Sequence, residues 1–331
     1  MKATAIAAPN IALVKYWGKR DEKLILPMKS SISVTMDDQL ATKTTVEFSE
    51  KHKEDELWIN DEKYSKPEDM EKAIPQLNFI REMTGINLKA KIVSKTVVPV
   101  AGGLAGSSAG LCTLAFSATN ALGLKLDKKD ISIVCRRGSG SACRSVYGGF
   151  VEWKSGEKSN GSDSYAVQIA DEHHWPEFRN VIALVETKEK KVKSRAGMRQ
   201  TVATSTLYPK RIQDLPKILD TVRNAILNKD LTTLLETVMR ESNNMHATML
   251  DTWPPIFYLN DTSKEIIYAI HDFNEDEIKA GYTFDAGPNP NIFTIEKYVN
   301  EIKKILQEIG IQKIFVCKPG FGPRIVNEHL F

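Results

Sequence analysis

The chain has 331 residues, of which 42% are hydrophobic and 26% are charged, and a formal net charge of +3 at pH 7. This length allows a substantial core and favours two domains of a globular protein. The small net charge excludes a general need for nucleic acid or an anionic membrane as partner. No stretch has the apolar length of a membrane span or of a signal-peptide core, so we expect a cytoplasmic protein.

The four cysteines show neither a C-x-x-C pair nor a histidine at metal-binding spacing; they are Cys112, Cys135, Cys143 and Cys317. This spacing favours free thiols in a reducing compartment over a zinc site. A hyperthermophilic source would be the exception that allows an intracellular disulfide.

The first part of the chain is expected to be rich in strands. Residues 3–8 predict a strand, and residues 9–20 then bring Lys15, Tyr16 and Lys19 close together. These side chains suit a cradle for phosphate or carboxylate, although lysines on loops usually belong to an ordinary solvated turn, which is the alternative here. Alternating β-branched residues at 31–36 and 42–48 predict two paired strands. A short strand at 57–61, a helix at 67–83 kinked or split at Pro75, and a strand at 86–98 follow.

A stretch rich in glycine and serine, residues 99–110, lies between the strand at 86–98 and an apolar helical segment at 111–122. Glycines that let a ligand approach the backbone stand at Gly102, Gly103 and Gly106. Ser107 and Ser108 fall where the helix begins, and a helix N-terminus favours a phosphate. We interpret the stretch as a polyphosphate-binding loop; serine caps and packing glycines are the alternative. It lacks the Lys-Ser or Lys-Thr ending of a Walker A loop and the G-x-G-x-x-G spacing of a dinucleotide site.

A second stretch of small residues, residues 138–149, follows a helix expected at 128–137 and precedes a strand at 150–153. It holds Arg144 among serines, and a guanidinium in such surroundings can receive a carboxylate or a phosphate. The alternative is a tight turn in which Arg144 pairs with a structural acid.

The second half is expected to begin near residues 180–190, where the composition shifts after a buried strand at 180–185. Residues 188–193 form a basic run typical of a solvated face. A helix is predicted after residues 194–199, running towards Thr204. Further helices are predicted at 208–250, broken at 228–230, and from a cap at Asp261 or Thr262 through Phe273. His246 suits a structural role better than that of a base.

The last informative stretch places Asp285 after a strand at 282–284 and before a Gly-Pro turn. An acid at a strand end beside glycine suits a catalytic base, but for a lone aspartate an Asx turn is the better explanation. A strand at 291–295, a helix at 297–309 and a strand at 313–317 complete the chain.

Four stretches together resemble the diphosphomevalonate decarboxylase family of the GHMP kinase superfamily in order and spacing: residues 10–19, 99–110, 138–145 and 282–289. Shorter similar stretches lie at 166–171, 201–205, 246–248 and 254–263, so the resemblance spans nearly the whole chain. It implies an α+β, two-domain fold with a left-handed βαβ crossover in the N-terminal domain. A C-terminal antiparallel sheet would pack on helices, with the active site in the cleft. We expect domains at 1–185 and 186–331.

The resemblance also implies a reaction in isoprenoid synthesis. Mevalonate 5-diphosphate and ATP, with Mg²⁺, would give isopentenyl diphosphate, carbon dioxide, ADP and phosphate. Asp285 matches the catalytic aspartate that orients or deprotonates the 3-hydroxyl. Lys15 matches the lysine that stabilises its charged form, and Arg144 matches the arginine that holds the substrate carboxylate. A homodimer that binds no nucleic acid and no membrane is expected.

The remaining matches concern binding. The substrate would be bound by Tyr16, Lys19, Ser139, Ser141, Ser194, Arg195 and Met198. ATP would be bound by Pro99, Gly102, Gly103, Leu104, Ala105, Gly106, Ser107 and Ser108, with Ser107 also facing the metal. The loop departs from the family pattern, because glycine stands at 106 where the first serine of the family's pair is usual, and a serine stands at 108. A relative that phosphorylates the 3-hydroxyl without decarboxylation, or that takes the monophosphate, is the alternative enzyme. A nucleotide-binding module without turnover is the non-enzymatic alternative.

Overall fold

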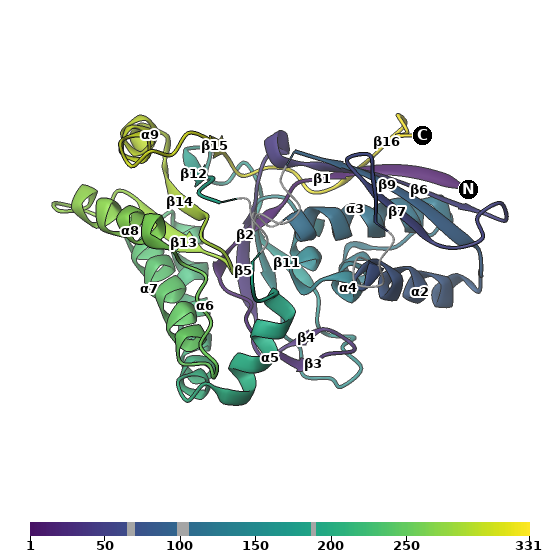
Figure 1. The fold of residues 1–331 in the computed structure, drawn as a ribbon, viewed down its shortest axis with the longest axis horizontal. Helices are drawn as coiled ribbons and strands as arrows, with labels where there is room; N and C mark the ends of the chain where they lie inside the picture. The colour runs from purple at the N-terminus through teal and green to yellow at the C-terminus, as the bar shows by residue number, and fades with distance from the viewer. Residues whose placement is uncertain (65–69, 98–105, 187–189) are drawn as a thin grey trace.

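The computed structural model describes residues 1–64, 70–97, 106–186 and 190–331, and its strands form three main sheets (Figure 1). The described helices are α2 (Ala73–Thr84), α3 (Gly106–Ala121), α4 (Lys128–Gly138), α5 (Ser194–Thr204), α6 (Tyr208–Asn228), α7 (Leu231–Leu250), α8 (Asp261–Phe273) and α9 (Val299–Glu308). Short 3₁₀ helices are η1 (Asp38–Leu40), η2 (Gly140–Val146) and η3 (Glu296–Tyr298). None of these helices combines the length and apolar content that crossing a membrane requires.

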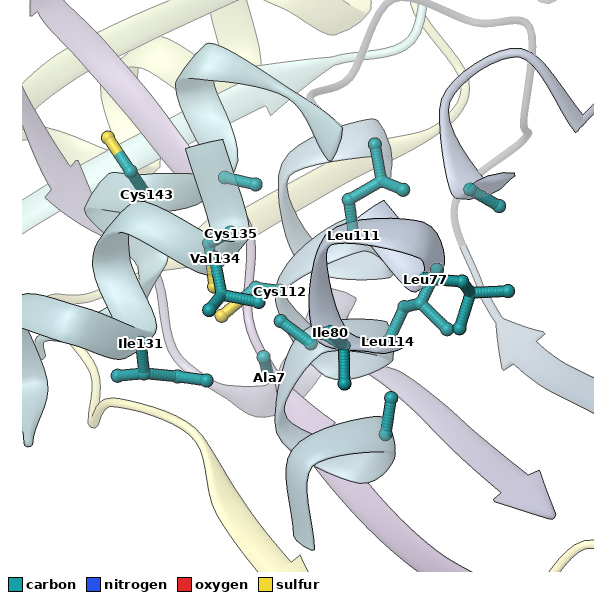
Figure 2. Packing of buried hydrophobic residues seen from close by; sticks show 14 of the residues in the cluster. Ala7, Leu77, Ile80, Leu111, Cys112, Leu114, Ile131, Val134, Cys135 and Cys143 are labelled. Atoms are coloured by element: carbon teal, nitrogen blue, oxygen red, sulfur yellow. The ribbon is translucent and has the colours of Figure 1, made fainter. Parts of the chain in front are cut away.

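The first sheet has six strands and carries the N-terminal helices. In spatial order its strands are β16 (Arg324–Val326), β1 (Lys2–Ala7), β6 (Thr42–Ser49), β9 (Lys89–Thr96), β7 (Glu56–Ile59) and β8 (Glu62–Tyr64). Its pairs are antiparallel apart from β7 with β9, which the chain joins through β8 and α2. Helix α3 packs on β1 and β6, and α2 and α4 pack beside it. Figure 2 shows their apolar side chains meeting around Leu77, Cys112 and Val134. All four cysteines are free and buried.

The second sheet lies at the centre of the molecule (Figure 1) and contributes to two cores. Its strands are, in order, β11 (Ala166–Ala170), β10 (Phe150–Trp153), β5 (Ser31–Thr35) and β2 (Asn10–Val14). Trp153 and Val151 pack into the core with α3 and α4, whereas Phe150 packs into a second core with α6 and α7. A two-stranded hairpin follows β2 and consists of β3 (Lys19–Asp21) and β4 (Leu26–Pro27).

The third sheet is antiparallel, with the order β13 (Gly281–Phe284), β14 (Pro290–Ile295), β12 (Phe178–Ala183) and β15 (Ile314–Cys317). Strand β12 is buried on both faces. Phe178 and Ile182 face the core with α6 and α7, and Val181 and Ala183 face a third core that includes residues of α8 and α9. Helices packed on antiparallel sheets make the fold α+β, as expected.

Several local expectations are corrected by the structure. The strands at 31–36 and 42–48 do not pair with each other: β5 joins the central sheet, whereas η1 leads the chain to β6 in the first sheet. Pro75 lies in the first turn of α2, where proline is tolerated, so the helix is continuous from Ala73. The cap of α8 is Asn260, whose side chain accepts from the backbone N–H of Ser263 in a capping box.

The expected division of the chain at residues 185 and 186 falls just after β12. By sheet membership β12 belongs with the C-terminal strands, because it pairs with β14 and β15. Strand β16, at the other end of the sequence, pairs with β1 in the first sheet. The two-domain boundary therefore stays a prediction, with one short strand from each part lying in the other part's sheet.

Candidate active site

An ion pair joins the ends of two strands from different sheets. Lys15 follows β2, and Asp285 follows β13. The Nζ atom of Lys15 lies 2.7 Å from Oδ1 of Asp285; the Lys15 side chain is 1% exposed and that of Asp285 is 29% exposed. A buried ammonium group requires a partner charge. Lys15 therefore holds the carboxylate in place, while the carboxylate stays accessible to a ligand.

His246, on α7, lies behind this ion pair. Its Nε2 atom is 3.4 Å from the carbonyl oxygen of Phe284, the residue before Asp285. Burial and, secondarily, the charge of Lys15 lower the pKa of His246 to about 4. The imidazole is therefore neutral near pH 7, in keeping with a structural role.

Lys190 also turns toward the acid, although its basic run resembled a solvated face in the sequence. Its Nζ atom donates to the carbonyl oxygen of Ala286, at 2.8 Å, and to Oγ of Ser194, at 3.1 Å. Burial lowers the pKa of Lys190, and the charge of Asp285 opposes that effect. Nothing in the local pattern distinguishes this lysine from its neighbours, so sequence reasoning missed it.

Arg144, in η2, is a buried cation held by neutral groups. Its Nε atom donates to Oδ1 of Asn10, at 3.1 Å, and Nη1 donates to Oγ of Ser31, at 2.7 Å. No carboxylate within the described parts of the chain makes an ion pair with Arg144. The alternative interpretation, in which Arg144 pairs with a structural acid, is therefore not supported there. Burial lowers the pKa of Arg144, and the charge of Asp285 is one of those that oppose this. A guanidinium in this situation is suited to an anionic ligand.

Asn10 is a functional candidate that sequence reasoning did not single out. While Oδ1 accepts from Arg144, Nδ2 donates to Oγ of Ser145, at 2.8 Å, and to the carbonyl oxygen of Ser141, at 2.9 Å. The amide thereby fixes Arg144 against η2. A polar residue at the start of an otherwise apolar strand, β2, was the available signal.

Tyr16 lies against the glycine-serine turn at the start of η2, which consists of the cap residue Ser139 with Gly140 and Ser141. Its ring packs edge-on against Trp153, with centroids 4.8 Å apart, and its buried hydroxyl has no hydrogen-bond partner among the residues that the structure describes. Burial raises the pKa of Tyr16. The hydroxyls of Ser139 and Ser141 lie 3.2 Å apart in the same turn. A buried phenol without a partner is costly unless a ligand supplies one.

The other predicted substrate residues come from the β3–β4 hairpin and from α5. Lys19 begins β3 and pairs with Glu22, whereas Arg195 pairs with Glu71 and donates to the carbonyl oxygen of Gly138. Met198, on α5, packs in an apolar cluster with Trp17, Tyr208 and Tyr258. The structure thus brings α5, the hairpin and the glycine-serine turn at the start of η2 together.

Of the predicted ATP residues, only those at the start of α3 can be placed. Ser107 is exposed in the first turn, whereas Ser108 is buried and its Oγ atom accepts from the backbone N–H of Asn10 at 3.4 Å. Five others lie outside the described residues; they are Pro99, Gly102, Gly103, Leu104 and Ala105.

The donor set suits a metal that is bound mainly through a ligand. In the described ranges no three histidine, cysteine or acidic residues cluster in a way that could hold a metal ion. Mg²⁺ is commonly bound by one or two protein oxygens together with phosphates and water. The exposed Ser107 hydroxyl fits that description.

The three sheets and the site at their junction define an enzyme of the GHMP kinase fold, the class that the sequence indicated. Residues 7–166 match the family model of the diphosphomevalonate decarboxylase-like N-terminal domain. Residues 180–312 match that of the mevalonate 5-diphosphate decarboxylase C-terminal domain.

Similar proteins agree with these matches. Diphosphomevalonate decarboxylase from Rattus norvegicus is 44% identical over 91% of this chain and 78% of the rat protein. The crystal structure of mevalonate diphosphate decarboxylase from Staphylococcus aureus is 36% identical, with a TM-score of 0.92 over 98% of each chain. A structure described as MDDEF in complex with MVAPP, AMPPCP and magnesium has the same identity and TM-score, over 98% of this chain and 99% of its own. The chain belongs to the diphosphomevalonate decarboxylase family.

Proposed function

We propose that the protein decarboxylates mevalonate 5-diphosphate to isopentenyl diphosphate at the expense of ATP. The observation that carries this proposal is the 2.7 Å ion pair between Lys15 and Asp285, formed across 270 positions of the sequence. It supplies a fixed, partly accessible carboxylate in a chain of this family. The neighbouring buried Arg144 supplies a cation for a second anionic group of the same substrate.

The chemistry follows from the poor leaving ability of a tertiary alcohol. Asp285 orients the 3-hydroxyl and accepts its proton as the oxygen attacks the γ-phosphorus of ATP, so that ADP leaves. The C–O bond of the phosphorylated intermediate then breaks and inorganic phosphate departs. The C–C bond to the carboxylate breaks next, its electron pair forms the new double bond, and carbon dioxide is released. Arg144 holds the carboxylate in the orientation that this step requires.

The diphosphate group of the substrate would lie among the hydroxyls and cations around the glycine-serine turn at the start of η2. We assign it to Tyr16, Lys19, Ser139, Ser141, Ser194 and Arg195, with Met198 closing the apolar side. The unpartnered buried hydroxyl of Tyr16 supports this assignment, because a phosphate oxygen would satisfy it.

ATP and Mg²⁺ would meet the substrate at the start of α3. Bound Mg²⁺ would neutralise charge on the transferring phosphates. We assign the phosphates to the stretch from Pro99 to Ser108 and the protein's contact with the metal to Ser107. An open surface depression adjoins Val97, just before this stretch; its lining is Ile6, Asp38, Ala41, Lys43, Asn60, Lys95, Thr96, Val97 and Arg324.

Three further expectations belong to this proposal. The working protein is a homodimer, its location is cytoplasmic, and its two domains divide near residue 185. Equilibrium sedimentation of the purified chain measures the first of these.

One assay tests the proposed reaction. The purified protein is incubated with ATP, Mg²⁺ and substrate labelled at the carboxyl carbon, and released carbon dioxide and phosphate are counted. The diphosphate should give both products in equal amounts. ADP without carbon dioxide would identify a 3-kinase instead, and turnover of the monophosphate alone would identify a phosphomevalonate decarboxylase.

Asp285→Asn should abolish carbon dioxide release and retain binding of the diphosphate, because the amide keeps the shape of the side chain but is a much weaker proton acceptor. The control is Asp261→Asn, which removes the same charge from an exposed acid at the start of α8. Full activity of Asp285→Asn would contradict the assignment.

A further inference from the structure

Two cations of the proposed diphosphate site are already paired with carboxylates. The Nζ atom of Lys19 lies 2.5 Å from Oε2 of Glu22. Nη1 of Arg195 lies 2.9 Å from Oε1 of Glu71, just before α2. Neither acid was identified by its sequence pattern. Each occupies the position where an anionic ligand of the same cation would bind.

The two pairs share an asymmetry of exposure. The Lys19 side chain is 3% exposed and that of Glu22 is 46% exposed, whereas Arg195 and Glu71 are 25% and 57% exposed. The cations are thus held by the protein, and the acids reach them from the solvent side. The pair of Arg195 with Glu71 is partly exposed and contributes little to stability, so Glu71 can leave at small cost. Lys19 is buried, so Glu22 can leave it only as another anion takes its place.

Arg195 has a second anchor that does not depend on its acid. Its Nη2 atom donates to the carbonyl oxygen of Gly138, the last residue of α4, at 2.8 Å. When Glu71 is displaced, this hydrogen bond keeps the guanidinium beside Gly138, next to the start of η2. The backbone of Lys19 is fixed independently of Glu22, because the residue pairs with Pro27 in the hairpin.

The electrostatic surroundings place both pairs around one space. Burial raises the pKa of Tyr16; the negative charge of Glu22 adds to this and the positive charge of Arg195 opposes it. Burial and the charge of Arg195 lower the pKa of Lys72 to about 8, and Glu71 opposes this effect. The two carboxylates are therefore counter-charges within a surplus of cations.

We propose that Glu22 and Glu71 are stand-in counterions that occupy Lys19 and Arg195 in the free enzyme and are displaced by the diphosphate of the substrate. This rests on the proposed function only in placing that diphosphate at these two cations. A diphosphate forms charge-assisted hydrogen bonds to both cations at once, so it can replace both acids. The acids reduce the affinity for the ligand, because their attraction to the cations must be lost and they then repel its charge.

Isothermal titration of the full chain with inorganic pyrophosphate, without Mg²⁺, tests this directly. Glu71→Gln should lower the dissociation constant about two- to fivefold, the range expected from a partly exposed ion pair. Glu22→Gln should lower it by at least as much, because it leaves the buried Lys19 without a counter-charge in the free enzyme. The double variant should lower the dissociation constant further than either single variant, although not by the exact product, because one diphosphate binds both cations. The KM for the proposed substrate should fall in parallel.

The control is Glu82→Gln, which removes an equal charge from an exposed position near the far end of α2. It should leave the dissociation constant unchanged, because salt screens a distant surface charge. Lys19→Gln and Arg195→Gln should both weaken pyrophosphate binding.

The possible results separate the two proposals. If the lysine and arginine variants weaken binding but the glutamate variants leave it unchanged or weaken it, the acids merely position the cations and the stand-in role is wrong. If the lysine and arginine variants have no effect, pyrophosphate binds elsewhere, and both the stand-in role and the assignment of the diphosphate site fail. Decarboxylase activity is measured separately and is not decided by either result.

Discussion

Two consecutive serines begin α3, and the helix directs them differently. Ser107 is exposed, whereas Ser108 is buried beside the backbone of Asn10. Consecutive residues on a helix are about 100° apart around its axis, so only one can face a ligand placed before the first turn. Ser107→Ala should therefore reduce turnover more than Ser108→Ala, by about 10-fold or more if its hydroxyl contacts the metal or the γ-phosphate.

The comparison requires a second measurement, because Ser108→Ala removes a buried group and can lower stability. Thermal melting of both variants separates the two effects: Ser108→Ala should melt at a lower temperature, and Ser107→Ala should melt as the unaltered protein does. Equal losses of turnover, or the reverse order, would show that the hydroxyl at 108 serves the nucleotide.

At the scale of elements, the start of η2 lies very close to the packed rings of Tyr16 and Trp153, and this close approach requires a glycine. A Cβ atom at Gly140 would lie 2.6 Å from the Trp153 ring and 2.7 Å from the Tyr16 ring. Trp153 is fully buried and cannot move aside. We expect Gly140→Ala to destabilise the fold by about 1–3 kcal/mol through overpacking. It should also raise the KM for the diphosphate, because Tyr16 is displaced.

Gly110, within α3, is the matched control. A Cβ atom there meets nothing within 4 Å, and replacing a glycine inside a helix with alanine usually stabilises by about 0.5–1 kcal/mol. Calorimetric melting should therefore move in opposite directions for the two variants. A Gly140→Ala protein that melts at or above the unaltered temperature would contradict the tight contact.

Elements whose ends carry their own signals were predictable from the sequence. The break between α6 and α7 is an example, because Lys229 takes a left-handed conformation and the Asp230 side chain accepts from Thr233 as a cap. Pairing between strands was not predictable, since β5 and β6 show the same alternation but enter different sheets. Alternation identifies a half-buried strand without identifying its partner.

The candidate site was likewise only partly predictable from the sequence. Residue types and family spacing indicated Lys15, Arg144 and Asp285 as candidates. Neither could indicate that Asn10 holds Arg144, nor that Lys190 turns inward from its basic run. Those roles depend on contacts between residues about 100 or more positions apart, for which periodicity carries no information.

At the scale of the whole molecule, one apolar core crosses the expected domain boundary. The core that contains Phe150 also contains Ile11 of β2, Phe178 of β12 and Leu234 of α7. The C-terminal end of the chain returns to the first sheet, where β16 pairs with β1. Each half of the sequence therefore completes hydrophobic packing or a sheet in the other half, and the ion pair between Lys15 and Asp285 joins both.

We accordingly expect the full chain to unfold in a single transition. Far-UV and near-UV circular dichroism should melt together, and the calorimetric and van't Hoff enthalpies should agree. A fragment of residues 1–185 should show no cooperative melt, because it lacks β16 and exposes the apolar face of the central sheet that α6 and α7 cover. Two separate transitions in the full chain, or a cooperative melt of the fragment, would show that the halves fold independently. The lysine and the aspartate would then be brought together by the docking of two preformed units rather than by one shared core.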